Sequence, residues 1–181
     1  MIENLITSRT RVKMLFRFFL NSHSKAHLRG LADEFGESTN SVRLELNNLC
    51  KAGYLISTGE GNIIRYSANV DHPLYPELQK IAHKCLGLDK IVDNVINRLI
   101  TRIGELDSAF ITGDYADGKD TGIIDLVLVG KLSMQQVRGY VQKAEKMIDR
   151  KIRLLVLSAE EFEKNKKNLA SETALYLWQK D

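Results

Sequence analysis

The stretch from Leu28 to Tyr66 constrains this 181-residue chain most strongly, because helical stripes and turn residues alternate there in a fixed order. The first apolar stripe comprises Leu28, Leu31, Ala32 and Phe35, and the second comprises Val42, Leu46, Leu49 and Cys50. The polar run 36–40 separates the stripes, and Gly53 ends the second one. Residues 54–58 and 63–66 then flank the polar run 59–62. The segment therefore predicts two short helices, a turn, a third helix and a polar-tipped hairpin.

This layout is typical of a winged helix-turn-helix, whose common use is to place a polar helix face in the DNA major groove. Residues 9–68 resemble the winged-helix regulators of the broad ArsR/MarR type, and the run 41–55 carries the resemblance. That family shows a recognition helix, a Leu-x-x-Ala-Gly-Leu pattern and then a wing. The resemblance implies sequence-selective binding of duplex DNA, usually by dimers. The metal-sensing cysteine pairs of some ArsR members are absent, so the resemblance implies no metal site.

Helical geometry predicts which face of the third helix meets DNA. With Val42 as reference, Leu46 and Leu49 point inward, and the opposite face is mainly polar. We predict a DNA-binding surface made of Ser38, Thr39, Asn40, Ser41, Arg43, Leu44, Asn47 and Lys51, with Asn62 and Arg65 from the hairpin. Asn and Arg match adenine and guanine edges, Lys51 suits a phosphate, and Ser38 is the expected N-cap. Two alternatives stay open: the face is merely solvated, and Leu44 either touches a thymine methyl or packs under the hairpin.

The pattern beyond the hairpin predicts a mixed α/β, two-domain chain. We expect a winged helix-turn-helix domain over 1–70, a helical linker over 71–104 and a second domain over 105–181. A broad apolar helix at about 8–21 should bury two sides, one of them against a dimer partner or the second domain. From residue 107 onward, strands and helices alternate, which predicts a small sheet with flanking helices.

The second domain resembles the minimal nucleotidyltransferase fold. The runs 113–118 and 122–129 correspond to the family's Gly-Ser-x-Ala-x-Gly and Ser-Asp-x-Asp-Leu patterns. In that family the glycine backbone cradles nucleotide phosphates and paired aspartates hold Mg²⁺. Here Asp114 replaces the serine and Ile123 replaces the first aspartate, which leaves Asp125 alone. We therefore predict a degenerate, non-catalytic domain, with Gly113, Asp114, Gly118 and Asp125 as a nucleotide-binding remnant.

Charge and composition bound the function further. Residues 1–70 hold nine Lys/Arg against six Asp/Glu, so the whole net charge of +3 lies in the predicted DNA-binding domain. No run is long and apolar enough for a membrane span, and no signal peptide is evident, so we expect a cytoplasmic protein without a membrane partner. The four histidines show no ligand pattern, and we expect no metal and no cofactor.

Three function classes follow from the sequence. The leading one is a homodimeric transcription regulator that binds duplex DNA, whose second domain senses a small-molecule or nucleotide effector or binds a protein. The alternatives are an active nucleotidyltransferase targeted by its winged helix, and an interaction protein whose winged helix binds another protein.

Overall fold

The chain is a mixed α/β protein with two separate sheets. The computed structural model describes residues 2–102, 105–169 and 173–180. It divides into two compact units, Met1–Cys85 and Leu86–Asp181. We call them unit 1 and unit 2 and describe each by itself.

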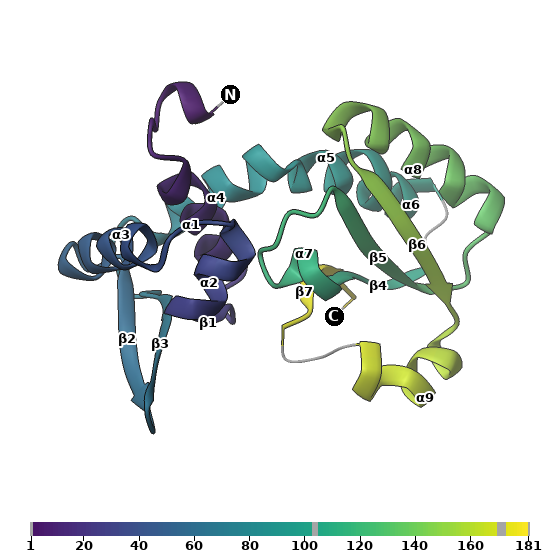
Figure 1. The fold of residues 1–181 in the computed structure, drawn as a ribbon. Helices are drawn as coiled ribbons and strands as arrows, with labels where there is room; N and C mark the ends of the chain where they lie inside the picture. The colour runs from purple at the N-terminus through teal and green to yellow at the C-terminus, as the bar shows by residue number, and fades with distance from the viewer. Residues whose placement is uncertain (1, 103–104, 170–172, 181) are drawn as a thin grey trace. The chain divides into compact units, whose positions relative to one another are not determined.

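Unit 1 combines helices with a small antiparallel sheet. Its elements are η1 (Ile2–Asn4), α1 (Arg9–Phe19), β1 (Lys25–His27), α2 (Leu28–Phe35), α3 (Thr39–Lys51), β2 (Leu55–Glu60), β3 (Ile63–Ala68) and α4 (Tyr75–Leu86), whose last residue belongs to unit 2. The strand order is β1-β3-β2 with antiparallel pairing throughout. Hairpin β2–β3 projects beyond the helices of this unit (Figure 1).

Local chemistry sets the ends of the main helices. Ser8 caps α1 and Ser38 caps α3, each side-chain oxygen accepting a hydrogen bond from the backbone N–H three residues later. Gly36 ends α2 in the left-handed conformation, which glycine adopts without the steric cost that other residues carry. The predicted order of helices and hairpin is therefore present, and the three-residue strand β1 is an addition.

The core of unit 1 forms around α1. Met14, Leu15, Phe18 and Phe19 are buried in one cluster with residues of α2, α3, the sheet and α4. Phe19 packs on Tyr75 with ring centroids 5.8 Å apart. The wide apolar surface of α1 thus packs on several elements of unit 1. α4 covers part of the surface that we expected a dimer partner or the second domain to cover.

Unit 2 is built on a four-stranded mixed sheet. Its elements are α5 (Leu88–Ile91), the π-helical turn η2 (Val92–Ile96), α6 (Asn97–Arg102), β4 (Leu106–Thr112), α7 (Gly113–Ala116), β5 (Ile123–Gly130), α8 (Met134–Ile148), β6 (Lys151–Leu157), α9 (Ala159–Leu169) and β7 (Leu175–Gln179). The strand order is β6-β5-β4-β7, with β5 and β6 parallel and the other neighbours antiparallel.

The sheet of unit 2 has helices on both faces. Val127 and Val129 of β5 pack with Phe162 of α9 on one face. Because side chains alternate along a strand, Leu126 and Leu128 point to the other face, where both are fully buried. Figure 1 shows α8 together with α5 and α6 on that side. The tail residues 175–179 supply the edge strand β7, which the sequence did not predict.

The predicted linker 71–104 is distributed between the two units. Most of α4 belongs to unit 1, where Tyr75 and Ala82 are buried in the core. The helices from Leu88 onward belong to unit 2, and Ile91, Val95 and Leu99 are fully buried. Apolar side chains of this helical segment are therefore buried within each unit. None of the helices in the described ranges combines the length and hydrophobicity that crossing a membrane requires.

Two leucines on α3 provide a matched test of this packing. Leu46 is fully buried and Leu44 is exposed. We expect Leu46→Ala to lower the free energy of unfolding by about 2–5 kcal/mol, through lost burial and a residual cavity. Leu44→Ala should change it by less than about 0.5 kcal/mol. Denaturant titration followed by circular dichroism measures both, and equal losses would contradict the orientation of α3.

Candidate nucleic-acid interface and a paired charge site

The outer face of α3 is open to solvent. Val42 and Leu46 are 0% exposed on the inner face and Glu45 is 8% exposed, whereas Leu44 is 63% exposed. The polar residues predicted for the outer face are also exposed: Thr39, Asn40, Arg43, Asn47 and Lys51. The exposure of Leu44 excludes the alternative in which it packs under the hairpin. The helix thus keeps one face in the core and leaves the other exposed to solvent.

A groove brings part of this face together with the hairpin. Arg43 and Asn47 of α3 and Asn62 at the hairpin tip line one groove of about 820 Å³. Its other walls are formed by His27, Leu28, Arg29, Ile63, Ile64 and Tyr66. His27 and Arg29, from the end of β1 and the start of α2, were not in the predicted set. The charge of Arg29 is visible in the sequence. Its exposure and its place in the groove beside α3 depend on the tertiary fold.

Intramolecular contacts orient or occupy several predicted residues. Arg43 donates a hydrogen bond from Nη1 to Asn40 Oδ1 at 2.9 Å, which restrains its guanidinium on the exposed face. The Ser38 hydroxyl accepts the capping N–H of Ser41 at 3.2 Å. The Ser41 hydroxyl lies 3.5 Å from Thr10 Oγ1. Ser38 and Ser41 therefore serve the helix end, while Asn40 and Arg43 stay available on the surface.

The hairpin offers less positive charge than its sequence suggests. Arg65 forms an ion pair with Glu60. Of the two hairpin residues in the predicted set, Asn62 lines the groove with Arg43 and Asn47, and Arg65 is not among the residues that line it.

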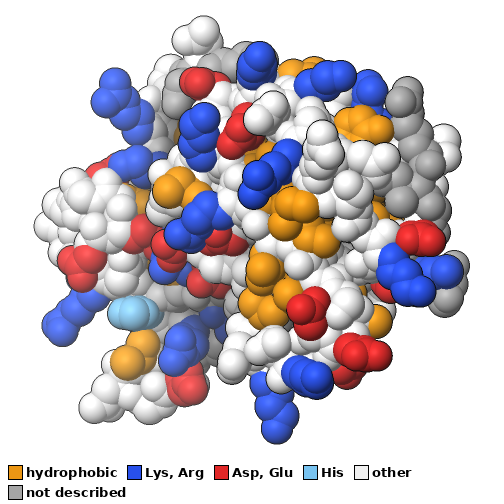
Figure 2. Space-filling view, turned by 90° about the vertical axis from the view of Figure 1, so that its right-hand side faces the viewer, with side chains coloured by type: hydrophobic (Ala, Val, Ile, Leu, Met, Phe, Trp, Pro, Cys, Tyr) orange, Lys and Arg blue, Asp and Glu red, His pale blue; other side chains and the backbone are white. Residues whose placement is uncertain are grey.

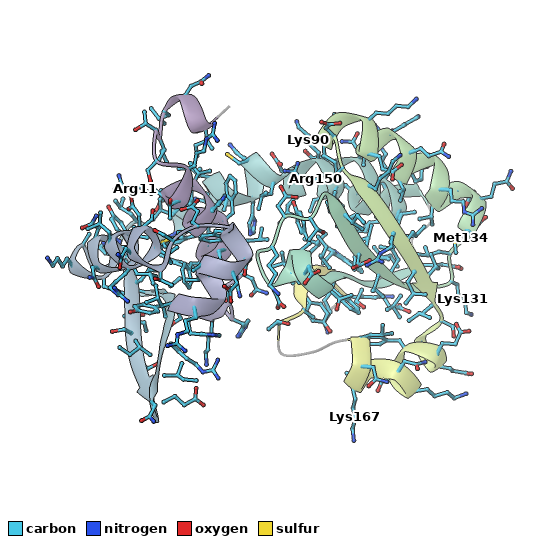
Figure 3. The ribbon with its side chains drawn as sticks, viewed as in Figure 1. Arg11, Lys90, Lys131, Met134, Arg150 and Lys167 are labelled. Carbon is cyan, nitrogen blue, oxygen red and sulfur yellow. The ribbon has the colours of Figure 1, made fainter. Side chains whose placement is uncertain are left out.

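Three of the four cations of α1 form ion pairs within unit 1. Arg11, labelled in Figure 3, donates from Nε and Nη2 to the carboxylate of Glu45 on α3 at 3.0 and 3.2 Å. Lys13 pairs with Glu37 at 3.1 Å, and Arg17 pairs with Glu34 at 3.2 Å. The positive excess counted over residues 1–70 therefore does not come from these side chains. The exposed cations outside these pairs include Arg9, Lys25, Arg29, Arg43 and Lys51.

Glu37 links the start of α3 to α1. Burial raises the pKa of its carboxyl, but hydrogen bonds from Thr10, Lys13 and Ser41 and the charge of Lys13 outweigh burial. The pKa of Glu37 consequently lies below its ordinary value of 4.5. The Glu37 carboxylate thus connects the turn before α3 to α1, the helix whose Arg11 also pairs with Glu45.

In unit 2, a glycine and an acid from the predicted remnant lie against each other. Gly113 follows β4 with φ of +72°, and a Cβ there would stand 2.9 Å from Asp125 Oδ2 on β5. Any larger residue would thus meet both backbone strain and this oxygen. Gly118 has φ of +83° and donates its N–H to the Tyr115 carbonyl at 3.0 Å, which closes the turn after α7. Gly113 belongs to the Asp125 site, and Gly118 has a turn role.

An arginine neutralises Asp125. Arg153 is the register partner of Asp125 on the parallel strand β6, and it donates from Nε and Nη2 to the two carboxylate oxygens at 2.5 and 2.7 Å. Its pKa is raised by the hydrogen bond and charge of Asp125, with a smaller contribution from the charge of Asp114. Asp114 itself pairs with Lys119 at 3.5 Å. The site therefore holds two acids and two cations.

This donor set does not fit the magnesium ions that the nucleotidyltransferase resemblance implies. A bound cation needs free carboxylate oxygens, and both oxygens of Asp125 already face a guanidinium. Within the described ranges, no group of three or more His, Cys, Asp or Glu side chains is placed to hold a metal ion.

The face of the molecule in Figure 2 has no large region in which all charged side chains carry the same sign. Lys and Arg side chains are interspersed there with Asp and Glu, and hydrophobic clusters lie between them. Arg150, labelled in Figure 3, illustrates this pairing, because it contacts Asp120 at 2.6 Å. Burial raises the pKa of Asp120, but the hydrogen bond and charge of Arg150 outweigh it and lower that pKa.

Comparisons with known proteins give little further guidance. No family model matches the chain, and no curated protein matches it. One solved structure, described as "a putative nucleotidyltransferase" from Sulfolobus solfataricus, is similar with a TM-score of 0.33 and 20% identity. The match covers 54% of this chain and 82% of that one. A TM-score this low does not establish a shared fold.

The contacts of Glu37 with Thr10, Lys13 and Ser41 predict a pH-dependent contribution to stability. Since its pKa is depressed in the folded protein, Glu37 stabilises the fold above its unfolded pKa and loses that effect as pH falls through the folded value. Glu37→Gln should cost about 1–2 kcal/mol at pH 7, and its difference from wild type should shrink between pH 5 and roughly pH 3.

Denaturant titrations at several pH values measure this difference. The matched control is Glu77→Gln, which removes an exposed partner of Lys80 and should change stability by less than about 0.5 kcal/mol. A Glu37 effect that is independent of pH would show that the carboxylate charge has no part in holding α3.

Proposed function

We propose that unit 1 is a winged helix-turn-helix that binds duplex DNA through the outer face of α3. The observation that carries this proposal is the division of α3 into a fully buried apolar face and an exposed face bearing Asn40, Arg43 and Asn47. These side-chain types match the donors and acceptors that base pairs present in the major groove. Hairpin β2–β3, which we take as the wing, places Asn62 in the same groove as Arg43 and Asn47.

The whole chain would then act as a transcription regulator in the cytoplasm. A two-fold operator would require a homodimer, since paired half-sites are the usual way in which small DNA-binding units gain affinity. Unit 2 would sense a small-molecule or nucleotide effector or bind another protein. The exposed cations Arg29, Arg43 and Lys51 support the DNA partner, whereas Arg11, Lys13 and Arg17 of α1 are paired within unit 1.

We further propose that unit 2 is a nucleotidyltransferase-like domain without catalysis. The pairing of Asp125 with Arg153 supports this, because one neutralised carboxylate is a poor ligand set for the metal ions of phosphoryl transfer. Asp114 stands where the family has a serine, and its negative charge would repel a phosphate.

Selection from a random duplex library at low salt tests the DNA-binding proposal. Enrichment of a defined sequence supports it, and related half-sites in the bound sequences would support a dimer. If no sequence is enriched, unit 1 is not a sequence-specific DNA-binding module, and a protein partner for α3 becomes the better proposal.

Substitutions on α3 should separate base contacts from phosphate contacts. Arg43→Ala should weaken binding of the selected duplex by about 1–3 kcal/mol and relax base preference at one position. Lys51→Ala should weaken all sequences similarly and lower the slope of log affinity against log salt by about 1. Lys80→Ala, which removes an exposed cation of α4, is the control. Unchanged affinity of Arg43→Ala, measured by fluorescence anisotropy, would contradict the assignment of α3.

The absence of catalysis is tested with labelled nucleoside triphosphates and Mg²⁺. We expect no transfer of label to protein, RNA or small-molecule acceptors by the wild-type protein. Asp93→Ala alters an exposed acid elsewhere in unit 2 and provides a control for Asp125→Ala. Transfer that survives in Asp93→Ala and disappears in Asp125→Ala would establish the targeted nucleotidyltransferase instead.

A further inference from the structure

Leu44 is an exposed leucine on the outer face of α3. It is 63% exposed, whereas Val42 and Leu46, two residues before and after it in the sequence, point to the opposite face and are fully buried. At 100° per residue, it lies within about 60° of Asn40, Asn47 and Lys51 on the helix circumference. It therefore sits inside the polar face of α3, not at the border between that face and the core.

The neighbours of Leu44 restrict what can cover it. An apolar protein surface placed over Leu44 would also cover Asn40, Arg43 and Asn47, and their polar groups would lose hydrogen bonds to water without replacement. The hydrogen bond from Arg43 to Asn40 uses one of the five N–H donors of the guanidinium. The fitting partner must offer one apolar spot surrounded by hydrogen-bonding groups.

The major-groove edge of an A·T base pair has that chemistry. Thymine presents a C5-methyl group beside its O4 acceptor, and adenine adds the N7 acceptor and N6 donor that an asparagine side chain matches. Guanine and cytosine offer no methyl group in this groove. The protein groove between α3 and the hairpin also contains the exposed side chains of Ile63 and Ile64, which could contact the methyl groups of further thymines.

We infer that Leu44 is a specificity-determining residue that contacts a thymine methyl group, and that the recognised half-site is an A·T-containing sequence. This inference rests on the proposed function. The methyl group is buried against the Leu44 side chain, while Asn40 or Asn47 hydrogen-bonds the neighbouring adenine. Leu44 thus discriminates thymine from cytosine by apolar contact alone.

Replacement of thymine by deoxyuracil in the selected duplex tests this inference directly. The change removes only the C5-methyl group and keeps base pairing. Replacing one such thymine in the duplex should weaken binding to wild-type protein about fourfold, the factor equivalent to about 0.8 kcal/mol for one buried methylene-sized group. For Leu44→Ala, affinity for the thymine and deoxyuracil duplexes should differ by less than about twofold at that position.

Leu74→Ala provides the matched control, because Leu74 is a similarly exposed leucine outside α3. It should retain the fourfold preference for thymine. Circular dichroism should show that both variants fold, since neither side chain belongs to the core.

Each outcome decides the question. Duplex binding that is insensitive to deoxyuracil at every position overturns the inference and leaves the proposed function standing. An undiminished thymine preference in Leu44→Ala also overturns it, because another residue then contacts the methyl group. Failure to select any duplex overturns the proposed function and the inference together.

Discussion

The anchoring of α3 is the interaction on which the function of unit 1 depends. Val42 and Leu46 fix the inner face of the helix by complete burial. Glu45, on the same side, accepts hydrogen bonds from Ser8 and Arg11 of α1. A buried carboxylate costs free energy unless it is paired, so this contact specifies the rotation of α3 as well as its position. The outer face is consequently held in one orientation.

The same contacts explain why the count of charged residues over 1–70 overstates the positive charge that is available on the surface. Three cations of α1 are positioned by Glu34, Glu37 and Glu45, so they act as interhelical contacts. The exposed face of α3 has few charges and several amides. Such a surface favours base recognition over non-specific attraction, because phosphate contacts supply most of the non-specific affinity.

The sequence predicted what depends on local chemistry. The cap Ser38, the buried pair Val42 and Leu46, and the hairpin turn follow from spacing and turn propensity. Long-range pairing was not predictable in this way. Strand β1 is three residues long and exists through its pairing with β3, and β7 exists through its pairing with β4. The same reason applies to the site, because the contacts of His27 and Arg29 with the α3 groove and the pairing of Asp125 with Arg153 arise only on folding.

The central claim is that the exposed face of α3 meets base pairs, and nuclear magnetic resonance tests it most directly. The amide and side-chain signals of isotope-labelled protein can be followed while a selected duplex is added. The account predicts that the largest shifts fall on Asn40, Arg43, Leu44 and Asn47 and on the hairpin tip, with little change on β5 and β6. Shifts confined to unit 2, or absent from residues 39–51, would contradict it.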